Sequence, residues 1–251
     1  MPRKGLVLAV PFGAWLVRRL PGATRPALAL EQAPQGLFLV WAAYAGLLLA
    51  AGVTLYRQGV WAMLLQADPT GLTLAICLLF AATTAWVGVR AWILGCQREA
   101  LQHWLQQAGA PPSAQPPSAD QTPAWAHTYF EAVRRRGADV SVARDLLGEA
   151  THGPHEMGWW LNGIQLKLGL LGKVIGFSVL ALELGQMQNF DPSQSTQLLK
   201  SLTGGLGIAL LTTMTGLAGN ILLGLQLMRL DRYADALVAD ILAAGEALRG
   251  G

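Results

Sequence analysis

Charged residues are scarce in this chain. Only 13% of its 251 residues are Asp, Glu, Lys or Arg, whereas 53% are hydrophobic, and the mean hydropathy is +0.38. A soluble domain of this length needs more charge than this to keep its surface hydrated. The composition therefore excludes an ordinary soluble domain and indicates an integral membrane protein.

Motifs of familiar catalysis are absent too. The chain has no Gly-rich loop followed by Lys-Ser or Lys-Thr, no paired histidines with an intervening Glu, no Cys-x-x-Cys and no Gly-x-Ser-x-Gly. Ser178 lies in an apolar run without a histidine partner in the next run. We therefore expect no enzyme and no cofactor. The two cysteines, Cys77 and Cys96, fall about 28 Å apart along one expected helix, too far for a disulfide.

Four apolar runs are each long enough to cross the hydrocarbon core of a membrane, which takes about 20 residues. They are continuous and do not alternate, so helices rather than strands are expected to satisfy their backbone amides in lipid. The expected spans are Gly36 to Tyr56, Thr70 to Leu94, Leu166 to Gln188 and Leu202 to Met228. We predict an all-α integral membrane protein with four transmembrane helices and helical cytoplasmic extensions.

Basic residues orient these spans. Of the 18 lysines and arginines, all but three lie in segments 1–35, 90–167 and 229–251, which four spans place on one side. Arg57 and Lys200 fall in short loops on the other side, and Lys173 falls inside a span. Because basic residues accumulate on the cytoplasmic side, both termini are expected there. This topology accounts for the net charge of +3, so we expect no nucleic-acid binding.

The spans divide the chain into five parts. These are a cytoplasmic or interfacial segment (1–35), two transmembrane helices (36–94), a cytoplasmic region (95–163), two more transmembrane helices (164–228) and a cytoplasmic C-terminal helix (229–251). In the first part, Arg18 and Arg19 end a short apolar run, which predicts a helix in the membrane interface; a cleaved signal peptide is the alternative. Five prolines in 109–124 predict a linker.

Two short helices are predicted after the linker, over residues 125–137 and 139–150. In the following "THGPHE", Gly153 and Pro154 break helical geometry, so we predict a loop. His152 and His155 lie in this loop without a further ligand nearby, and we expect no metal site. The tail has apolar residues every three to four positions, which predicts an amphipathic helix that continues the fourth span.

The third and fourth spans carry small and polar stripes. In the third, Gly169, Gly172 and Gly176 share one helix face, which favours close approach of another helix, and Lys173 borders that face. The fourth has a stripe of Ala209, Thr213, Gly216, Asn220 and Gly224, with Thr212 and Thr215 beside it. Small residues alone are an ordinary packing surface. A lysine at mid-membrane costs about 2.5 to 3.5 kcal/mol, so it favours a bundle interior or an ion pathway.

Two motifs in these spans resemble a known family. The stretches "LGLLGKVIGF" (168–177) and "GLGIALLTTMTGLAGNIL" (205–222), separated by a short outer loop, resemble the signature of the MotA/TolQ/ExbB family of inner-membrane ion-channel subunits. The resemblance covers roughly residues 158–240. Four spans with a large cytoplasmic segment are similar to the MotA branch, whereas the motifs are closer to TolQ and ExbB, so the subfamily stays open.

The resemblance implies a place in the bacterial inner membrane and a homo-oligomeric ring, typically a pentamer. The ring would surround a dimeric single-span partner of the MotB/TolR/ExbD type, whose membrane aspartate carries a proton or sodium ion. Ion flow would drive movement of that partner. The implied pathway residues are Lys173, Thr212, Thr213 and Asn220, and the implied helix-packing residues are Gly169, Gly172, Gly176, Gly216 and Gly224.

Two residues depart from the family pattern. Lys173 stands where the energiser branch has threonine, and Ile208 stands where it has glutamate. Lys173 can pair transiently with the partner's aspartate during ion passage. It can also form a permanent positive ring that repels cations and leaves a non-conducting scaffold, or extend along lipid towards the interface near Lys167. A solute transporter fits less well, because no repeat with broken helices is evident.

Overall fold

The computed structural model describes residues 36–68, 70–108, 124–135, 140–185 and 192–250, and these form helices without any strand. The helices are α2 (Gly36–Arg57), α3 (Val60–Ala67), α4 (Leu72–Ala108), α5 (Ala124–Arg134), α6 (Val140–Gly185) and α7 (Pro192–Gly250). The predicted all-α class is thus confirmed for this part of the chain. The predicted interfacial segment 1–35 and residues 109–123 of the predicted linker lie outside the described residues.

Four of these helices, α2, α4, α6 and α7, are long and apolar enough to cross a membrane, so the described residues hold as many candidate spans as the sequence predicts. α6 has 46 residues and α7 has 59. At helical rise they measure about 69 and 88 Å, against a hydrocarbon core of about 30 Å. Both helices therefore extend far beyond the membrane.

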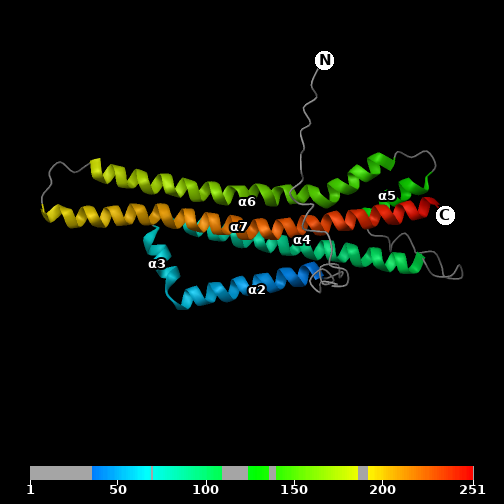
Figure 1. The fold of residues 1–251 in the computed structure, drawn as a ribbon, viewed down its shortest axis with the longest axis horizontal. Coiled ribbons are helices and arrows are strands. Elements are labelled where there is room, and N and C mark those ends of the chain that lie inside the picture. Colours follow the sequence, from blue (N-terminus) through cyan, green and yellow to red (C-terminus); the bar gives the residue numbers. More distant parts are fainter. Residues whose placement is uncertain (1–35, 69, 109–123, 136–139, 186–191, 251) are drawn as a thin grey trace, which may run out of the picture.

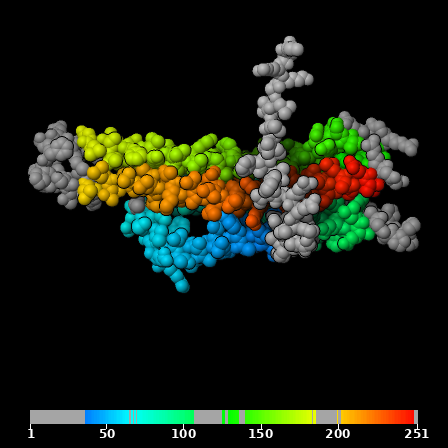
Figure 2. Space-filling view, in the orientation of Figure 1, coloured from blue at the N-terminus to red at the C-terminus, as the bar shows by residue number. Residues whose placement is uncertain are grey.

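α6 and α7 form an antiparallel hairpin and run side by side along their lengths (Figure 1). α4 packs along α7, α2 and α3 lie on the side of α4 and α7 that is away from α6, and α5 lies near the C-terminal end of α7. The space-filling view shows the hairpin as one long edge of the molecule, with α2 and α3 projecting from the other edge (Figure 2). The α6–α7 hairpin is therefore the longest continuous contact in the fold.

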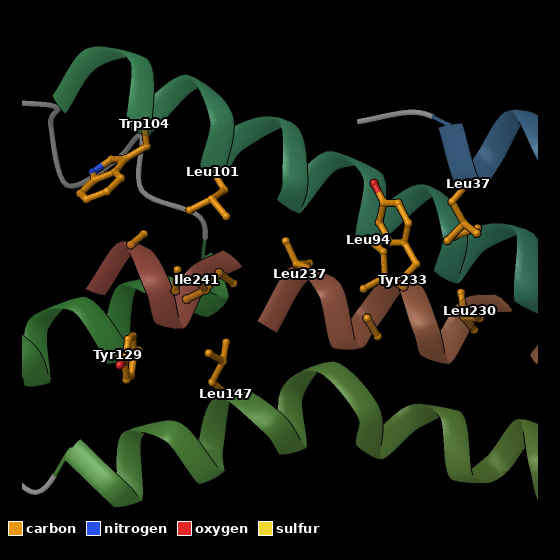
Figure 3. Close-up of a cluster of buried hydrophobic side chains, with 14 of the residues drawn as sticks. Leu37, Leu94, Leu101, Trp104, Tyr129, Leu147, Leu230, Tyr233, Leu237 and Ile241 are labelled. Carbon is orange, nitrogen blue, oxygen red and sulfur yellow. The ribbon is translucent and has the colours of Figure 1, made fainter. Parts of the chain in front are cut away.

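The main hydrophobic core joins α4, α5, α6 and α7 (Figure 3). Leu101, Leu147 and Ile241 are buried there, and Trp104 stacks on Phe130 with ring centroids 4.7 Å apart. Most of this cluster lies beyond the apolar spans. In contrast, only 11% of the apolar window of α2 and 22% of that of α6 are buried. The chain therefore has its own core outside the membrane and leaves most of its intramembrane surface for lipid or for other copies.

The loop predicted at residues 57–69 contains a short helix, α3, which the sequence analysis missed. Gly59 precedes it with φ 73°, a left-handed conformation that glycine adopts at little cost. After α3, the Asp68 carboxylate accepts hydrogen bonds from the backbone N–H of Thr73 at 2.7 Å and of Thr70 at 3.0 Å. Burial raises the pKa of Asp68, but the hydrogen bond from the Thr70 hydroxyl, together with these backbone hydrogen bonds, outweighs it and holds the pKa below its ordinary value.

The loop predicted at "THGPHE" is wrong, and the helix predicted over residues 139–150 is present from Val140 but does not end before that stretch. α6 runs without a break from Val140 through Pro154 to Gly185. Tertiary contacts on both sides of the proline stabilise the helix. Arg90 of α4 donates to the Thr151 carbonyl at 3.1 Å, and a Cβ added at Gly158 would lie 2.7 Å from Leu227. Packing against α4 and α7 thus outweighs the local preference of Gly153 and Pro154 for a break.

α7 is a single helix from Pro192 to Gly250, so the predicted C-terminal amphipathic helix is confirmed as a continuation of the fourth span. It begins well before Leu202, where the predicted span starts. Proline is favoured in the first helical turn, because its missing N–H would have no partner there. The polar residues that follow Pro192 carry no apolar signal, which is why the span prediction started later.

An ion pair fixes α4 to α7 beyond the membrane. Arg98 Nη2 lies 2.6 Å from Asp240 Oδ2, and its guanidinium carbon lies 4.9 Å from the Tyr233 ring centre. Because Asp240 is about half exposed, we expect Arg98→Gln to destabilise the fold by about 1 kcal/mol. Arg135→Gln, which breaks an exposed pair with Glu131, is the control and should cost less than about 0.5 kcal/mol. Chemical denaturation followed by tryptophan fluorescence measures both; equal effects would contradict the prediction.

Candidate functional site

Backbone meets backbone where the small residues of α6 and α7 face each other. A Cβ added at Gly176 would lie 2.6 Å from the Gly205 carbonyl oxygen, and one added at Gly216 would lie 2.8 Å from the Gln165 carbonyl oxygen. Gly169 lies against Gly216 in the same way, with its added Cβ 3.3 Å from the Gly216 Cα. These glycines let the two helices approach so closely that any side chain would push them apart.

Thr212 lies inside this contact. It is fully buried, and a Cβ added at Gly172 would overlap its side chain. Its hydroxyl donates to the Ile208 carbonyl of its own helix at 2.8 Å. Thr212 was expected to line the pathway, but within this chain it packs between α6 and α7 and has no open side.

Thr213 and Asn220 lie at the edge of the same contact, and both are half-buried. The Thr213 hydroxyl donates to the Ala209 carbonyl at 2.7 Å and lies 3.3 Å from the Gly169 carbonyl. Asn220 Nδ2 donates to the Asn162 carbonyl at 2.9 Å, across the two helices. The Thr213 oxygen keeps lone pairs that can accept a hydrogen bond or contact a hydrated cation.

Gly224 continues this edge with a looser contact. A Cβ added there would lie 3.4 Å from the side-chain nitrogen of Asn162, so an alanine could be accommodated by a small shift. Gly224 therefore limits the helix separation less strictly than Gly176 or Gly216 does.

Lys173 borders the contact and is exposed. Within the part of the chain that the structure describes, no hydrogen bond and no ion pair involves its ammonium group. Lys173 lies near the middle of the predicted third span. The described residues therefore supply neither a counter-ion nor burial for this charge.

One edge of the hairpin carries most of these polar groups. His152, Trp159 and Lys173 are separated by multiples of seven residues, which places them on one side of α6. On α7, Thr213 and Asn220 are also seven residues apart. These two residues and the three of α6 lie on the same side of the hairpin. We call this edge the polar flank and define it as Lys173, Trp159, His155 and His152 of α6 with Thr213, Asn220, Asp231 and Asp235 of α7.

α4 covers the other side of the hairpin. The amide of Gln226 donates to the Thr84 hydroxyl of α4 at 3.2 Å. Gln226 is five residues from Asp231, and at 3.6 residues per turn the two lie about 140° apart around α7. Asp231 therefore faces away from the Gln226–Thr84 contact, while Arg90 of α4 reaches the Thr151 carbonyl next to His152.

No protein-family model, no curated protein and no solved structure matches the chain. The MotA/TolQ/ExbB family therefore remains a prediction from the two motifs of the third and fourth spans.

The sequence analysis missed a group of paired side chains at the end of the polar flank that lies beyond the apolar runs. His155 Nδ1 lies 2.8 Å from Asp231 Oδ1, and Trp159 Nε1 donates to Asp231 Oδ2 at 2.8 Å. His152 Nε2 lies 2.9 Å from Asp235 Oδ1. We call His152, His155, Asp231 and Asp235 the His–Asp ladder. Its signal in the sequence is a pair of histidines three apart and a pair of aspartates four apart, on helices that pair antiparallel.

The two rungs of the ladder differ in burial. The His155 side chain is 3% exposed, whereas the Asp235 side chain is 73% exposed. Burial lowers the pKa of His155, and Arg90 and His152 lower it further, while Asp231 raises it; the net result is a pKa below the ordinary value for histidine. Burial thus favours the neutral form of the His155 ring. Within the described ranges, no group of three or more His, Cys, Asp or Glu residues is arranged to hold a metal ion.

Proposed function

We propose that the chain is a ring-forming subunit of an inner-membrane motor or energiser driven by protons or sodium ions. Several copies would surround a dimeric single-span partner that carries a membrane aspartate, and ion flow would move that partner. The polar flank of α6 and α7 would face the centre of the ring.

The observation that carries this proposal is the exposed, unpaired Lys173 in the middle of a span. An isolated ammonium group in hydrocarbon is costly, so an assembled complex has to offer it water or an anion. A partner carboxylate at the centre of a ring is such an anion. In a low-dielectric site, this pair would be much stronger than at a protein surface.

Two further features support the proposal. The apolar windows of α2, α4, α6 and α7 are at most one-third buried, which leaves broad surfaces for contact between copies. α6 and α7 also continue without a break into the core that α4 and α5 complete outside the membrane. A rigid hairpin of this kind can transmit a change at Lys173 to the aqueous end of the molecule.

Imaging of the complex purified in lipid nanodiscs tests the proposal. We expect a ring of copies with additional helices at its centre, and a copurifying single-span protein with an acidic membrane residue. Lys173 and Thr213 should point to the centre. A ring without central helices, with Lys173 directed into lipid, would contradict the proposal.

A non-conducting scaffold of the same architecture is the second candidate, and one observation favours it. Thr212 is fully buried, and the Thr213 hydroxyl donates its only proton to a backbone carbonyl. Ile208, at the position of the family's glutamate, is also buried. The flank then offers few free groups for an ion. Reconstitution of the complex into liposomes separates the two candidates, since only the motor conducts protons or sodium ions.

A further inference from the structure

The His–Asp ladder lies where the polar flank leaves the membrane. Residues 140–163 carry charged side chains and precede the apolar part of α6, so the ladder belongs to the aqueous side of the span. The ring centroids of His152 and His155 are 5.9 Å apart, and each ring holds its own aspartate. The ladder thus runs from the buried His155, paired with the partly exposed Asp231, to the partly exposed His152, paired with the exposed Asp235.

One ring nitrogen of His155, Nε2, has no hydrogen-bond partner among the described residues. Its Nδ1 faces the Asp231 carboxylate, which accepts a hydrogen bond and so requires the ring proton on Nδ1 when the ring is neutral. Nε2 is then left with a lone pair. In the described part of the chain, this atom is buried and has no hydrogen-bond partner. Trp159 holds the other Asp231 oxygen, so the carboxylate is fixed in place and orients the imidazole.

We propose that His155 is a proton-binding site at the cytoplasmic end of the polar flank, through which protons pass on their way to the cytoplasm. This inference rests on the proposed function, and it adds that the ion is a proton. Asp231 holds and orients the ring, and the pair of His152 with Asp235 is its neighbour on the solvent side, with the two histidine ring centroids 5.9 Å apart.

The proposed step changes only N–H and O–H bonds. A hydronium ion or a protonated carboxyl group gives its proton to the Nε2 lone pair, and water or a carboxylate remains. The imidazolium that forms is neutralised by the Asp231 carboxylate. In release, the Nε2–H bond breaks, the proton passes to a water molecule on the cytoplasmic side, which becomes hydronium, and the ring returns to the neutral Nδ1–H form.

Charged and titratable groups from three helices act on His155. Asp231 of α7 favours the protonated ring, whereas Arg90 of α4 and His152 of α6 disfavour it, and Asp235 lies behind His152. A group with a pKa below the ordinary value binds a proton weakly and releases it readily at neutral pH, which suits an exit site. Substitutions at Asp231 and Arg90 should therefore change proton binding in opposite directions.

Histidine NMR of the ¹⁵N-labelled complex in nanodiscs tests proton binding directly, because the chain has only 4 histidines. We expect a neutral Nδ1–H form of His155 that titrates below the ordinary pH range. Asp231→Asn should lower its pKa further and Arg90→Gln should raise it. A His155 signal that does not titrate between pH 4 and pH 8, or that is the same in both variants, would overturn the proposal.

Proton flux into pyranine-loaded liposomes tests the role in transport. We expect His155→Gln to lower the flux about tenfold, and the acid limb of the pH profile to move down in Asp231→Asn and up in Arg90→Gln. His103→Gln, at an exposed position of α4, is the control and should behave as wild type. Size-exclusion chromatography shows whether each variant assembles. If His155→Gln does not assemble, the pH profile of Asp231→Asn tests the proposal instead.

The outcomes for this inference and for the motor differ. A wild-type complex that conducts sodium ions but no protons would overturn the exit site and leave the motor in place. A complex that conducts neither ion would overturn the motor, and with it the exit site. Proton flux that is unchanged in His155→Gln would overturn the exit site alone.

Discussion

Lys173→Ala should lower partner-dependent ion flux at least about 100-fold. In the proposed ring, the lysine pairs with a carboxylate in a low-dielectric site, and removal of one member of a buried pair costs about 3 to 5 kcal/mol. A cost of 3 kcal/mol corresponds to a factor of about 100. Flux measured in liposomes with the copurified partner checks this value, as does the amount of partner retained on purification.

Lys173→Ala and Lys173→Thr, compared together, distinguish the three possible roles of Lys173: pairing with a carboxylate, a blocking positive ring, and extension along lipid. Lys173→Thr restores the residue of the energiser branch and removes the charge, so the pairing hypothesis expects a loss in both variants. If a positive ring blocks cations, both variants should instead gain conductance. Flux that is unchanged in both would leave Lys173 as a lysine that extends along lipid. Lys167→Ala, on an exposed position six residues earlier in α6, is the control and should change little.

The sequence was sufficient for the spans because the physics that sets them is local. A run of about 20 apolar residues has to be helical in lipid, and this holds without knowledge of any neighbour. The close approach at Gly176 and Gly216 was also predictable, since glycines on one face of a span have few other uses. Each of these features depends on one helix and its solvent.

The His–Asp ladder could not be predicted, because it depends on two helices and on a long-range register. Gly153 and Pro154 indicate a loop by their local preferences, and tertiary contacts such as those with Arg90 and Leu227 favour the helix instead. Once α6 is continuous, the antiparallel hairpin determines the partners. Pairs such as His155 with Asp231 and Gly169 with Thr213 then follow from the antiparallel register of α6 and α7.

Polar groups of the hairpin fall into two classes, those enclosed between α6 and α7 and those at the edge of this contact. Groups that face the contact, such as Thr212, satisfy the backbone of their own helix and fix the packing. Groups at the edge, such as Lys173 and His152, are accessible to solvent or to another molecule. Sequence periodicity places both classes on nearly the same face, and only the distance between the helices tells which residues are enclosed.

Gly176→Val should destabilise the hairpin by about 1 to 3 kcal/mol or more, the usual cost of added volume in a packed contact. A Cβ at this position would lie 2.6 Å from the Gly205 carbonyl oxygen and 2.8 Å from the Ala209 amide nitrogen. Both are backbone atoms, so no side-chain rotation relieves the overlap, and α6 has to move away from α7. Thermal unfolding of the purified complex, followed by tryptophan fluorescence, measures the loss.

Gly163→Ala provides a control of opposite sign on the same helix. An added Cβ at Gly163 has nothing within 4 Å, so the substitution removes only the entropic cost of a helical glycine and should stabilise by up to about 1 kcal/mol. Because the Thr213 hydroxyl lies 3.3 Å from the Gly169 carbonyl only while the helices touch, Gly176→Val should also reduce ion flux. Equal stability of the two variants would mean that α6 and α7 are farther apart in the assembled complex, and that the polar flank is arranged by contacts between copies rather than by the hairpin itself.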